Sequence, residues 1–227
     1  MKDSFEINKN IWTNIYKARQ NNLAYPNENL VRYLFYLYPD KNFSELKVLD
    51  YGFGSGSNLR HLDALGCDVY GVEICEYAKQ LTLEKLRDGF DADKLFIMDQ
   101  EVNLPYEKKK FDLVIAWQVL YYNSIESLAK VLYSIKSILK PEGKFIGTMA
   151  RKEDISITNS KPRNKYERVS NEVLGNQAGS RLIAVSSEDD IKKLFNMFSA
   201  LQIGYFESNL NNIVCSHWII YGENENE

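Results

Sequence analysis

Short apolar, β-rich runs alternate with helical stretches through the middle of the chain. The apolar runs predict strands at residues 47–50, 68–72, 95–98, 111–116 and 144–148. Between them, apolar residues at helical spacing predict helices at about 57–65, 74–87 and 124–139. The run FDLVIA at 111–116 is almost continuously apolar, which is typical of a strand covered on both faces. The pattern predicts an α/β fold with a doubly wound, mostly parallel sheet.

The two ends of the chain add to this core. Apolar residues from Phe5 to Tyr16 predict one helix, and Asn27 can cap a second that stops before Pro39. After residue 150 the segment 151–181 is polar and shows no clear periodicity. A helix near 188–198 follows. Strands at 201–206 and 213–221, joined by an Asn-rich turn, then predict an antiparallel hairpin at the sheet edge. We therefore expect seven strands in all.

A glycine-rich turn leaves the first strand and carries the sharpest chemical signal. Gly52, Gly54 and Gly56 follow Asp50, and a helix begins next. Glycines let a ligand approach the backbone closely, and this turn lies at the carboxyl edge of a doubly wound sheet, where ligands bind. A dinucleotide fingerprint would place its third glycine at position 57, where this chain has Ser57, so the spacing weakens an NAD hypothesis.

Acidic residues follow the next two strands. Glu73 ends the second strand, about 20 residues after the glycines, and is placed to accept hydrogen bonds from both hydroxyls of a ribose. Asp99 follows the third strand and is placed to accept from an adenine amine, with Met98 or Gln100 near the ring and Ile74 packing on one adenine face. Because the carboxyl ends of parallel strands meet at one edge, these side chains are expected to converge.

Five motifs in order resemble those of class I S-adenosylmethionine-dependent methyltransferases. They are VLDYGFGSG, the GVE that ends at Glu73, the pair Met98-Asp99, FDLVIAWQVL and LKPEGKFIG. The resemblance implies a Rossmann-like methyltransferase fold and S-adenosylmethionine as cofactor, with S-adenosylhomocysteine as product. It implies that Asp50 and the three glycines surround the methionine part of the cofactor, and that Trp117 and Gln118 line its acceptor-facing side. Tyr16 and Tyr25 are either further cofactor contacts or core of the N-terminal helices.

The resemblance also divides the expected single domain, 1–227. Its parts are an N-terminal helical cap (1–45), a cofactor-binding core (46–150), a lid over the acceptor (151–185) and a terminal helix with two strands (186–227). The N-terminal residues 12–16, WTNIY, are similar to a bacterial subgroup associated with surface-polysaccharide genes. The Asn/Asp-Pro-Pro-aromatic motif of nucleobase amino methyltransferases is absent, because residues 116–119 read AWQV.

The charge and composition of the chain exclude several classes of partner and location. The 227 residues hold 28 basic and 31 acidic side chains, a net charge of −3, which disfavours a general nucleic-acid binder. Three scattered cysteines predict neither a disulfide framework nor a metal site. The polar N-terminus and the short apolar runs predict no secretory signal and no membrane helix. We expect a cytoplasmic enzyme that methylates O or N of a small-molecule acceptor, and we leave the oligomeric state open.

Candidates for acceptor chemistry are few. Tyr121 and Tyr122 follow the fourth strand and either touch the acceptor or form aromatic cover, and His217 in the last strand is a candidate base or a packing residue. The segment 151–181 holds seven basic side chains against four acidic ones. Its arginines are candidates to bind an anionic acceptor such as a sugar or phosphate intermediate, and the alternative is an ordinary solvated loop. The four arginine candidates are Arg151, Arg163, Arg168 and Arg181.

Two other functions stay open at this point. The chain could be a catalytically silent module that keeps the cofactor pocket, or an NAD-dependent oxidoreductase with an unusual glycine turn.

Overall fold

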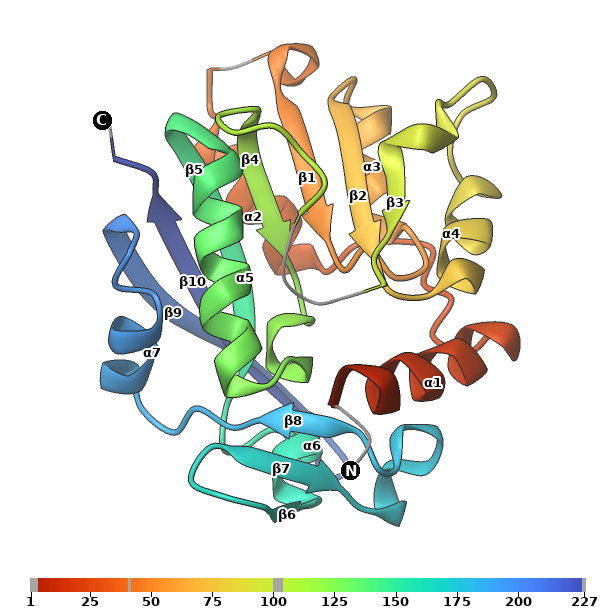
Figure 1. The fold of residues 1–227 in the computed structure, drawn as a ribbon, viewed down its shortest axis with the longest axis vertical. Helices are drawn as coiled ribbons and strands as arrows, with labels where there is room; N and C mark the ends of the chain where they lie inside the picture. Colours follow the sequence, from red (N-terminus) through yellow and green to blue (C-terminus); the bar gives the residue numbers. More distant parts are fainter. Residues whose placement is uncertain (1–3, 41, 100–103, 226–227) are drawn as a thin grey trace.

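A seven-stranded sheet forms the centre of the protein, whose computed structural model describes residues 4–40, 42–99 and 104–225. The strand order is β3-β2-β1-β4-β5-β10-β9 (Figure 1). The first five of these strands are parallel, and β10 runs antiparallel to both β5 and β9. The strands are β1 (Lys47–Tyr51), β2 (Asp68–Glu73), β3 (Leu95–Ile97), β4 (Phe111–Ala116), β5 (Leu139–Ala150), β9 (Ser199–Leu210) and β10 (Ile213–Glu223). The predicted fold class is confirmed.

Helices cover both faces of this sheet. The helices are α1 (Ser4–Lys17), α2 (Glu28–Leu37), α3 (Ser57–Ala64), α4 (Glu76–Leu83), α5 (Ile125–Ile138), α6 (Ile155–Thr158) and α7 (Glu188–Leu194). Neighbouring residues of β1 point to opposite faces, so Val48 belongs to the core beneath α2, α3 and α4, and Leu49 to the core beneath α5 and α7. This double burial explains why the strands are apolar at successive positions. Among the described residues, no helix has both the length and the apolar character to cross a membrane.

Local sequence signals set several element ends. The Asn27 side chain accepts a hydrogen bond from Asn29 N at 2.9 Å and caps α2, as predicted. Asn211 and Asn212 both have positive φ and form the two-residue turn between β9 and β10. Both strands of this hairpin extend beyond the predicted ranges, because residues 202–210 pair with 213–221 and Ser199 pairs with Glu223 after a bulge.

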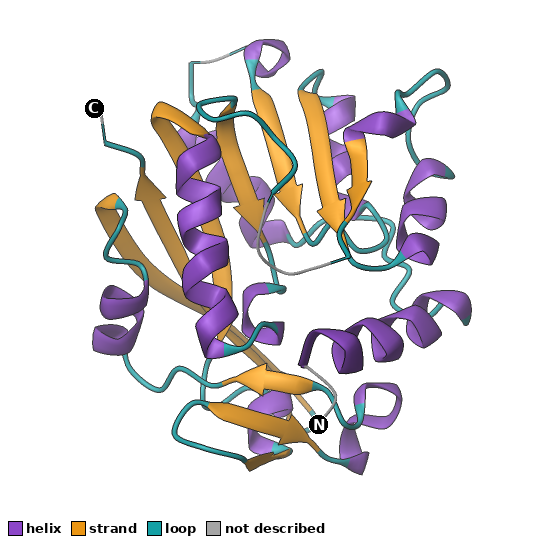
Figure 2. Cartoon of the chain, viewed as in Figure 1, coloured by secondary structure: helices purple, strands orange, loops and turns teal. Residues whose placement is uncertain are grey.

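The segment 151–181 is more ordered than its lack of periodicity indicates. It contains α6 and the strands β6 (Ser160–Pro162) and β7 (Glu167–Ser170). In a separate antiparallel sheet, β7 pairs with β6 on one side and with β8 (Arg181–Ile183) on the other. Figure 2 shows this small sheet beyond the carboxyl ends of the parallel strands. Strands of three or four residues are too short to display alternation, so the sequence carried no visible signal for them.

Candidate active site

The glycine turn folds back tightly against its neighbours. Gly52 N donates a hydrogen bond to Val72 O at 2.8 Å, which joins the end of β1 to β2. Gly54 has a φ of +54°, and a Cβ there would lie 2.7 Å from the Tyr16 hydroxyl of α1. A side chain at this position would therefore be strained by the positive φ, and the Tyr16 hydroxyl would have to move. Both conditions favour glycine at this point of the turn.

The Glu73 carboxylate lies directly beside this turn. It is 8% exposed, and its two oxygens accept hydrogen bonds from Gly54 N at 3.0 Å and from Ile74 N at 2.7 Å. Burial raises the pKa of Glu73, and the backbone N–H donors oppose that rise. Each carboxylate oxygen has a second lone pair, so the group can still accept hydrogen bonds from a bound ligand.

Asp50 lies behind the turn and is fully buried. Asn58 Nδ2 is 3.4 Å from Asp50 Oδ1, while Asp50 Oδ2 has no hydrogen-bond partner among the described residues. Burial raises the pKa of Asp50 to about 7, and the negative Glu73 nearby adds to the rise. The turn therefore rests on an acid that changes its charge near neutral pH.

The linker between α1 and α2 is fastened to the glycine turn. Ser55 Oγ accepts from Leu23 N at 3.1 Å and donates to Asn21 O at 3.2 Å. Lys85 Nζ, two residues after the end of α4, donates to Leu23 O at 2.8 Å and to Ser55 O at 2.5 Å. These bonds close one side of the site with residues far away in sequence.

A single asparagine fixes α1 across the other side. Asn8 is 2% exposed, donates to Tyr122 O at 2.6 Å and to Arg181 O at 3.0 Å, and accepts from Arg181 N at 2.8 Å. Beside it, Trp12 meets Tyr122 edge-on with ring centroids 5.2 Å apart and stacks on Tyr16 at 5.6 Å. The helix α1 is thus tied both to the turn after β4 and to β8.

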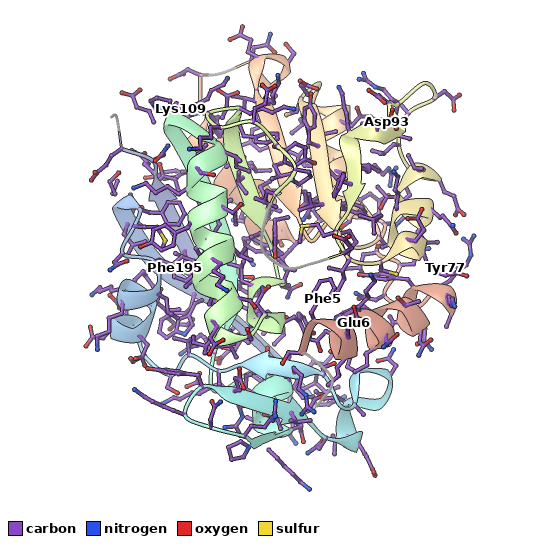
Figure 3. All side chains as sticks on the ribbon, viewed as in Figure 1. Phe5, Glu6, Tyr77, Asp93, Lys109 and Phe195 are labelled. Atoms are coloured by element: carbon purple, nitrogen blue, oxygen red, sulfur yellow. The ribbon has the colours of Figure 1, made fainter. Side chains whose placement is uncertain are left out.

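These elements enclose a cavity of about 370 Å³. Its described lining contains Glu73 as the only carboxylate, and no Lys, Arg or His. Phe5 projects from the start of α1 into this lining (Figure 3). Of the residues singled out from the sequence, the cavity brings together Tyr16, Tyr25, Gly52, Gly54, Glu73, Ile74, Trp117, Gln118 and Tyr122.

Three predicted cofactor residues lie elsewhere, and one is not described. Asp50 is behind the turn, and Gly56 precedes α3 with a φ of +82°, packed against Thr82. Asp99 is exposed and does not line the cavity as described, although the neighbouring Met98 does. Gln100 lies outside the described residues. The hydrogen bond from the adenine amine to Asp99 and the place of Gln100 near the ring stay predictions.

The wall after β4 combines aromatic and polar groups. Trp117 stacks on Phe206 of β9, with centroids 6.0 Å apart and planes 3° apart, and its Nε1 is buried without a hydrogen-bond partner in the described chain. Gln118 has a φ of +56°, and its backbone N donates to Thr148 Oγ1 at 2.7 Å. The Trp117 N–H is thus a buried polar atom of the cavity wall that is available to a ligand.

Two of the three catalytic candidates lie behind this wall. Tyr121 and His217 are both buried, and the Tyr121 hydroxyl is 3.3 Å from His217 Nε2. Neither is among the described residues that line the cavity, whereas Tyr122 is. Burial raises the pKa of Tyr122, so its phenol stays protonated at neutral pH. A direct catalytic role for each of the three stays a prediction.

The four arginines of the expected lid are placed outside the described lining of the cavity. Arg151 donates to Glu207 at 3.1 Å and to Ser216 Oγ at 2.9 Å, and its guanidinium lies over the rings of Tyr205 and Trp218. The other three contact parts of the small sheet: Arg168 donates to Ser160, Arg163 pairs with Glu167 at 3.9 Å, and Arg181 lies in β8. Substrate binding by these arginines stays a prediction.

Sequence reasoning missed several asparagines that line the cavity, among them Asn8, Asn58 and Asn123. A signal existed for Asn8, because it occupies the same helical stripe as Phe5 and Trp12, where a polar residue stands among apolar ones. The other two follow turns whose course only the folded chain reveals.

Comparison with known proteins agrees with this geometry. A family model described as a methyltransferase domain matches residues 19–199. The chain belongs to this methyltransferase family. The predicted family and enzyme class are thereby confirmed.

The arginine-hydroxylase NDUFAF5 of Mus musculus mitochondria is 33% identical over 104 residues, 45% of this chain and 28% of the relative. The sterol 4-C-methyltransferase strm-1 of Caenorhabditis elegans is 32% identical over 99 residues, 43% of this chain and 29% of the relative. This methyltransferase thus matches less than a third of the length of either curated relative.

Solved structures share its fold. A magnesium protoporphyrin IX methyltransferase from Synechocystis with bound S-adenosylmethionine has a TM-score of 0.66 and 17% identity, over 99% of both chains. A 1,6-didemethyltoxoflavin-N1-methyltransferase from Burkholderia thailandensis, with bound acceptor and S-adenosylhomocysteine, has a TM-score of 0.66 and 13% identity, covering 97% of this chain and 88% of that one. At these identities the likeness shows the fold, which is that of enzymes using this cofactor.

Proposed function

We propose that this protein transfers a methyl group from S-adenosylmethionine to a nitrogen of a small molecule that carries no negative charge. The observation that carries the proposal is the cavity between the glycine turn and α1, with Glu73 as its only described charged group. A net charge of −3 and a concave site of about 370 Å³ support a small molecule over a nucleic acid as acceptor.

The described residues fit the proposed cofactor. Glu73 would accept from the ribose hydroxyls, and Ile74 and Met98 offer apolar contact for the adenine. Gly52 and Gly54 would hold the methionine part, and the unpaired Trp117 N–H offers one donor. When bound, the cofactor supplies an electrophilic methyl group on a positively charged sulfur. The enzyme's task is then to align the acceptor with that methyl group and exclude water.

The acceptor end of the cavity supports nitrogen over oxygen. Its described walls include Asn8, Trp12 and Tyr122, and hold no histidine or lysine that could take a proton. The Asn8 amide already makes three hydrogen bonds to backbone groups, and the Tyr122 hydroxyl donates to Gln177 Oε1 at 3.2 Å. A hydroxyl acceptor benefits from a general base, whereas a neutral amine attacks through its own lone pair. The aromatic faces of Trp12 and Tyr122 suit a flat or apolar acceptor.

An anionic acceptor is the second candidate, because of Arg181. Burial and the nearby positive charge of Arg163 lower the pKa of Arg181, and its Nε is buried with no hydrogen-bond partner in the described chain. An anion beside Arg181 would relieve both conditions. Sugar or phosphate intermediates of surface-polysaccharide synthesis are acceptors of this class.

The two acceptor classes can be separated by measuring S-adenosylhomocysteine formation with a set of acceptors that share one carbon skeleton. The panel carries an amine, an alcohol, a carboxylate or a phosphate on the same aromatic frame. Turnover of the amine alone supports the proposal. Turnover confined to the carboxylate or phosphate, with a KM raised by Arg181→Gln, supports the second candidate instead. Tight binding of S-adenosylhomocysteine with no turnover would indicate a silent module.

A further inference from the structure

Three different metal-ligating side chains converge behind Gln118, outside the cavity. They are Asp154, the N-cap residue of α6, and Cys215 and His217 of β10. Residues two apart on a strand share a face, which places the cysteine and the histidine side by side. The sulfur, a ring nitrogen and a carboxylate oxygen lie within 4.8 Å of one another.

We propose that Asp154, Cys215 and His217 bind a borderline-soft divalent metal ion such as Zn²⁺. His217 Nδ1 is 3.7 Å from Cys215 Sγ and 3.6 Å from Asp154 Oδ2. Tetrahedral Zn²⁺, with bonds of about 2.0 to 2.3 Å, holds neighbouring donor atoms about 3.3 to 3.6 Å apart. Both distances from His217 Nδ1 are therefore within a few tenths of an ångström of this spacing, and Cys215 Sγ lies within 4.8 Å of the Asp154 carboxylate.

The geometry favours a metal site over a nucleophilic relay. In a Cys-His-Asp relay the sulfur and the carboxylate contact opposite nitrogens of the ring. Here both approach the same nitrogen, Nδ1, while Nε2 faces the Tyr121 hydroxyl at 3.3 Å. A metal-ligating histidine commonly uses its second nitrogen in this way, donating to an outer partner that fixes the ring.

The surrounding contacts hold the three donors in place. The His217 ring stacks on Phe206 with centroids 5.3 Å apart and planes 13° apart. Asp154 Oδ1 accepts from the backbone N and the hydroxyl of Ser156 at 2.9 and 2.5 Å, and Oδ2 accepts from Ser216 N at 2.9 Å. An Oδ2 lone pair remains for a metal. A thiolate and a carboxylate together neutralise a divalent cation, so the filled site carries no net buried charge.

A fourth ligand position would face Gln118. Its side-chain amide lies 4.0 Å from Cys215 Sγ, and Gln118 also lines the cavity. Three protein ligands plus one open position is the arrangement of zinc sites that bind water or a substrate. The proposed ion would therefore be separated from the cavity by Gln118.

The test is titration of the purified, chelator-treated protein with Co²⁺ and with Zn²⁺ against a chromophoric chelator. Wild-type protein is expected to bind one ion, with a sulfur-to-cobalt charge-transfer band. Cys215→Ser should abolish that band and weaken Zn²⁺ binding at least tenfold. Tyr121→Phe, which removes the outer partner of His217, should weaken Zn²⁺ binding but keep the band. Cys67→Ser, a buried cysteine outside the cluster, is the matched control and should keep both signals.

Circular dichroism and S-adenosylhomocysteine binding identify variants that fail to fold. A wild-type protein that binds no Co²⁺, or a folded Cys215→Ser variant that binds as wild type, would overturn the proposal. Because the readout needs no methyl transfer, it is independent of the proposed function.

Discussion

Ionisation of the buried Asp50 is expected to lower the free energy of unfolding as the pH rises. An unfolded aspartate has a pKa of about 3.9, whereas the folded value is about 7. The native state therefore holds the proton more tightly than the unfolded chain does. The contribution of Asp50 to stability is greatest below about pH 4, falls as the pH rises to about 7, and is constant above that.

The size of the effect follows from the shift. About three pKa units correspond to roughly 4 kcal/mol, of which about 2.5 kcal/mol is lost between pH 5 and pH 8. Asp50→Asn keeps an acceptor oxygen for the 3.4 Å contact with Asn58 but has no charge to bury. The free energy of unfolding of this variant relative to wild type should therefore improve by about 2.5 kcal/mol over this pH range.

Urea unfolding, followed by circular dichroism at pH 5, 6, 7 and 8 without cofactor, measures this difference. Asp93→Asn is the matched control, because Asp93 is exposed and lies at the outer edge of the molecule (Figure 3). Its curve should run parallel to wild type. If the Asp50→Asn curve is also parallel to wild type, the acid behind the glycine turn is not held in its protonated form.

Three further substitutions test how the site is held together. Asn8→Ala should lower the free energy of unfolding, measured by urea titration, by about 3 kcal/mol, because the buried backbone groups bonded to Asn8 lose their partner. The control Asn10→Ala, at an exposed position of the same helix, should change it by less than about 0.5 kcal/mol. Gly54→Ala should reduce S-adenosylhomocysteine affinity at least tenfold in calorimetry, whereas Gly89→Ala, with positive φ but open space around it, should leave it unchanged. Lys85→Met should weaken the same affinity by about tenfold as the linker detaches, and an unchanged value would show that the linker does not shape the site.

The sequence predicts the core of the fold because burial there is periodic. The strands β1, β2 and β4 follow from their apolar runs, and the glycine turn and Glu73 follow from their places at strand ends. The small sheet of β6, β7 and β8 could not be predicted from the sequence. Its strands are too short to show alternation of apolar and polar residues, and each is held by pairing with another strand of the same sheet.

In the candidate site, too, some residues could be predicted from local sequence and others depend on contacts between distant segments. Glu73 reaches the cavity because it ends a strand, a position that the sequence fixes to within a residue. Asn8 reaches it through hydrogen bonds to Tyr122 and Arg181, more than 100 residues away along the chain. The paired positions of Tyr121 and His217 depend on how β10 lies beside β5, which no local pattern indicates.

Binding of S-adenosylhomocysteine by Glu73 variants tests the central claim most directly. Calorimetry should show binding by wild type, a 10- to 100-fold loss in Glu73→Gln, since a neutral amide replaces the charged acceptor, and no loss in Glu76→Gln, whose side chain is exposed on the next helix. Absence of binding by wild type, or equal affinity in a folded Glu73→Gln protein, would contradict the assignment of this cavity to the methyl donor.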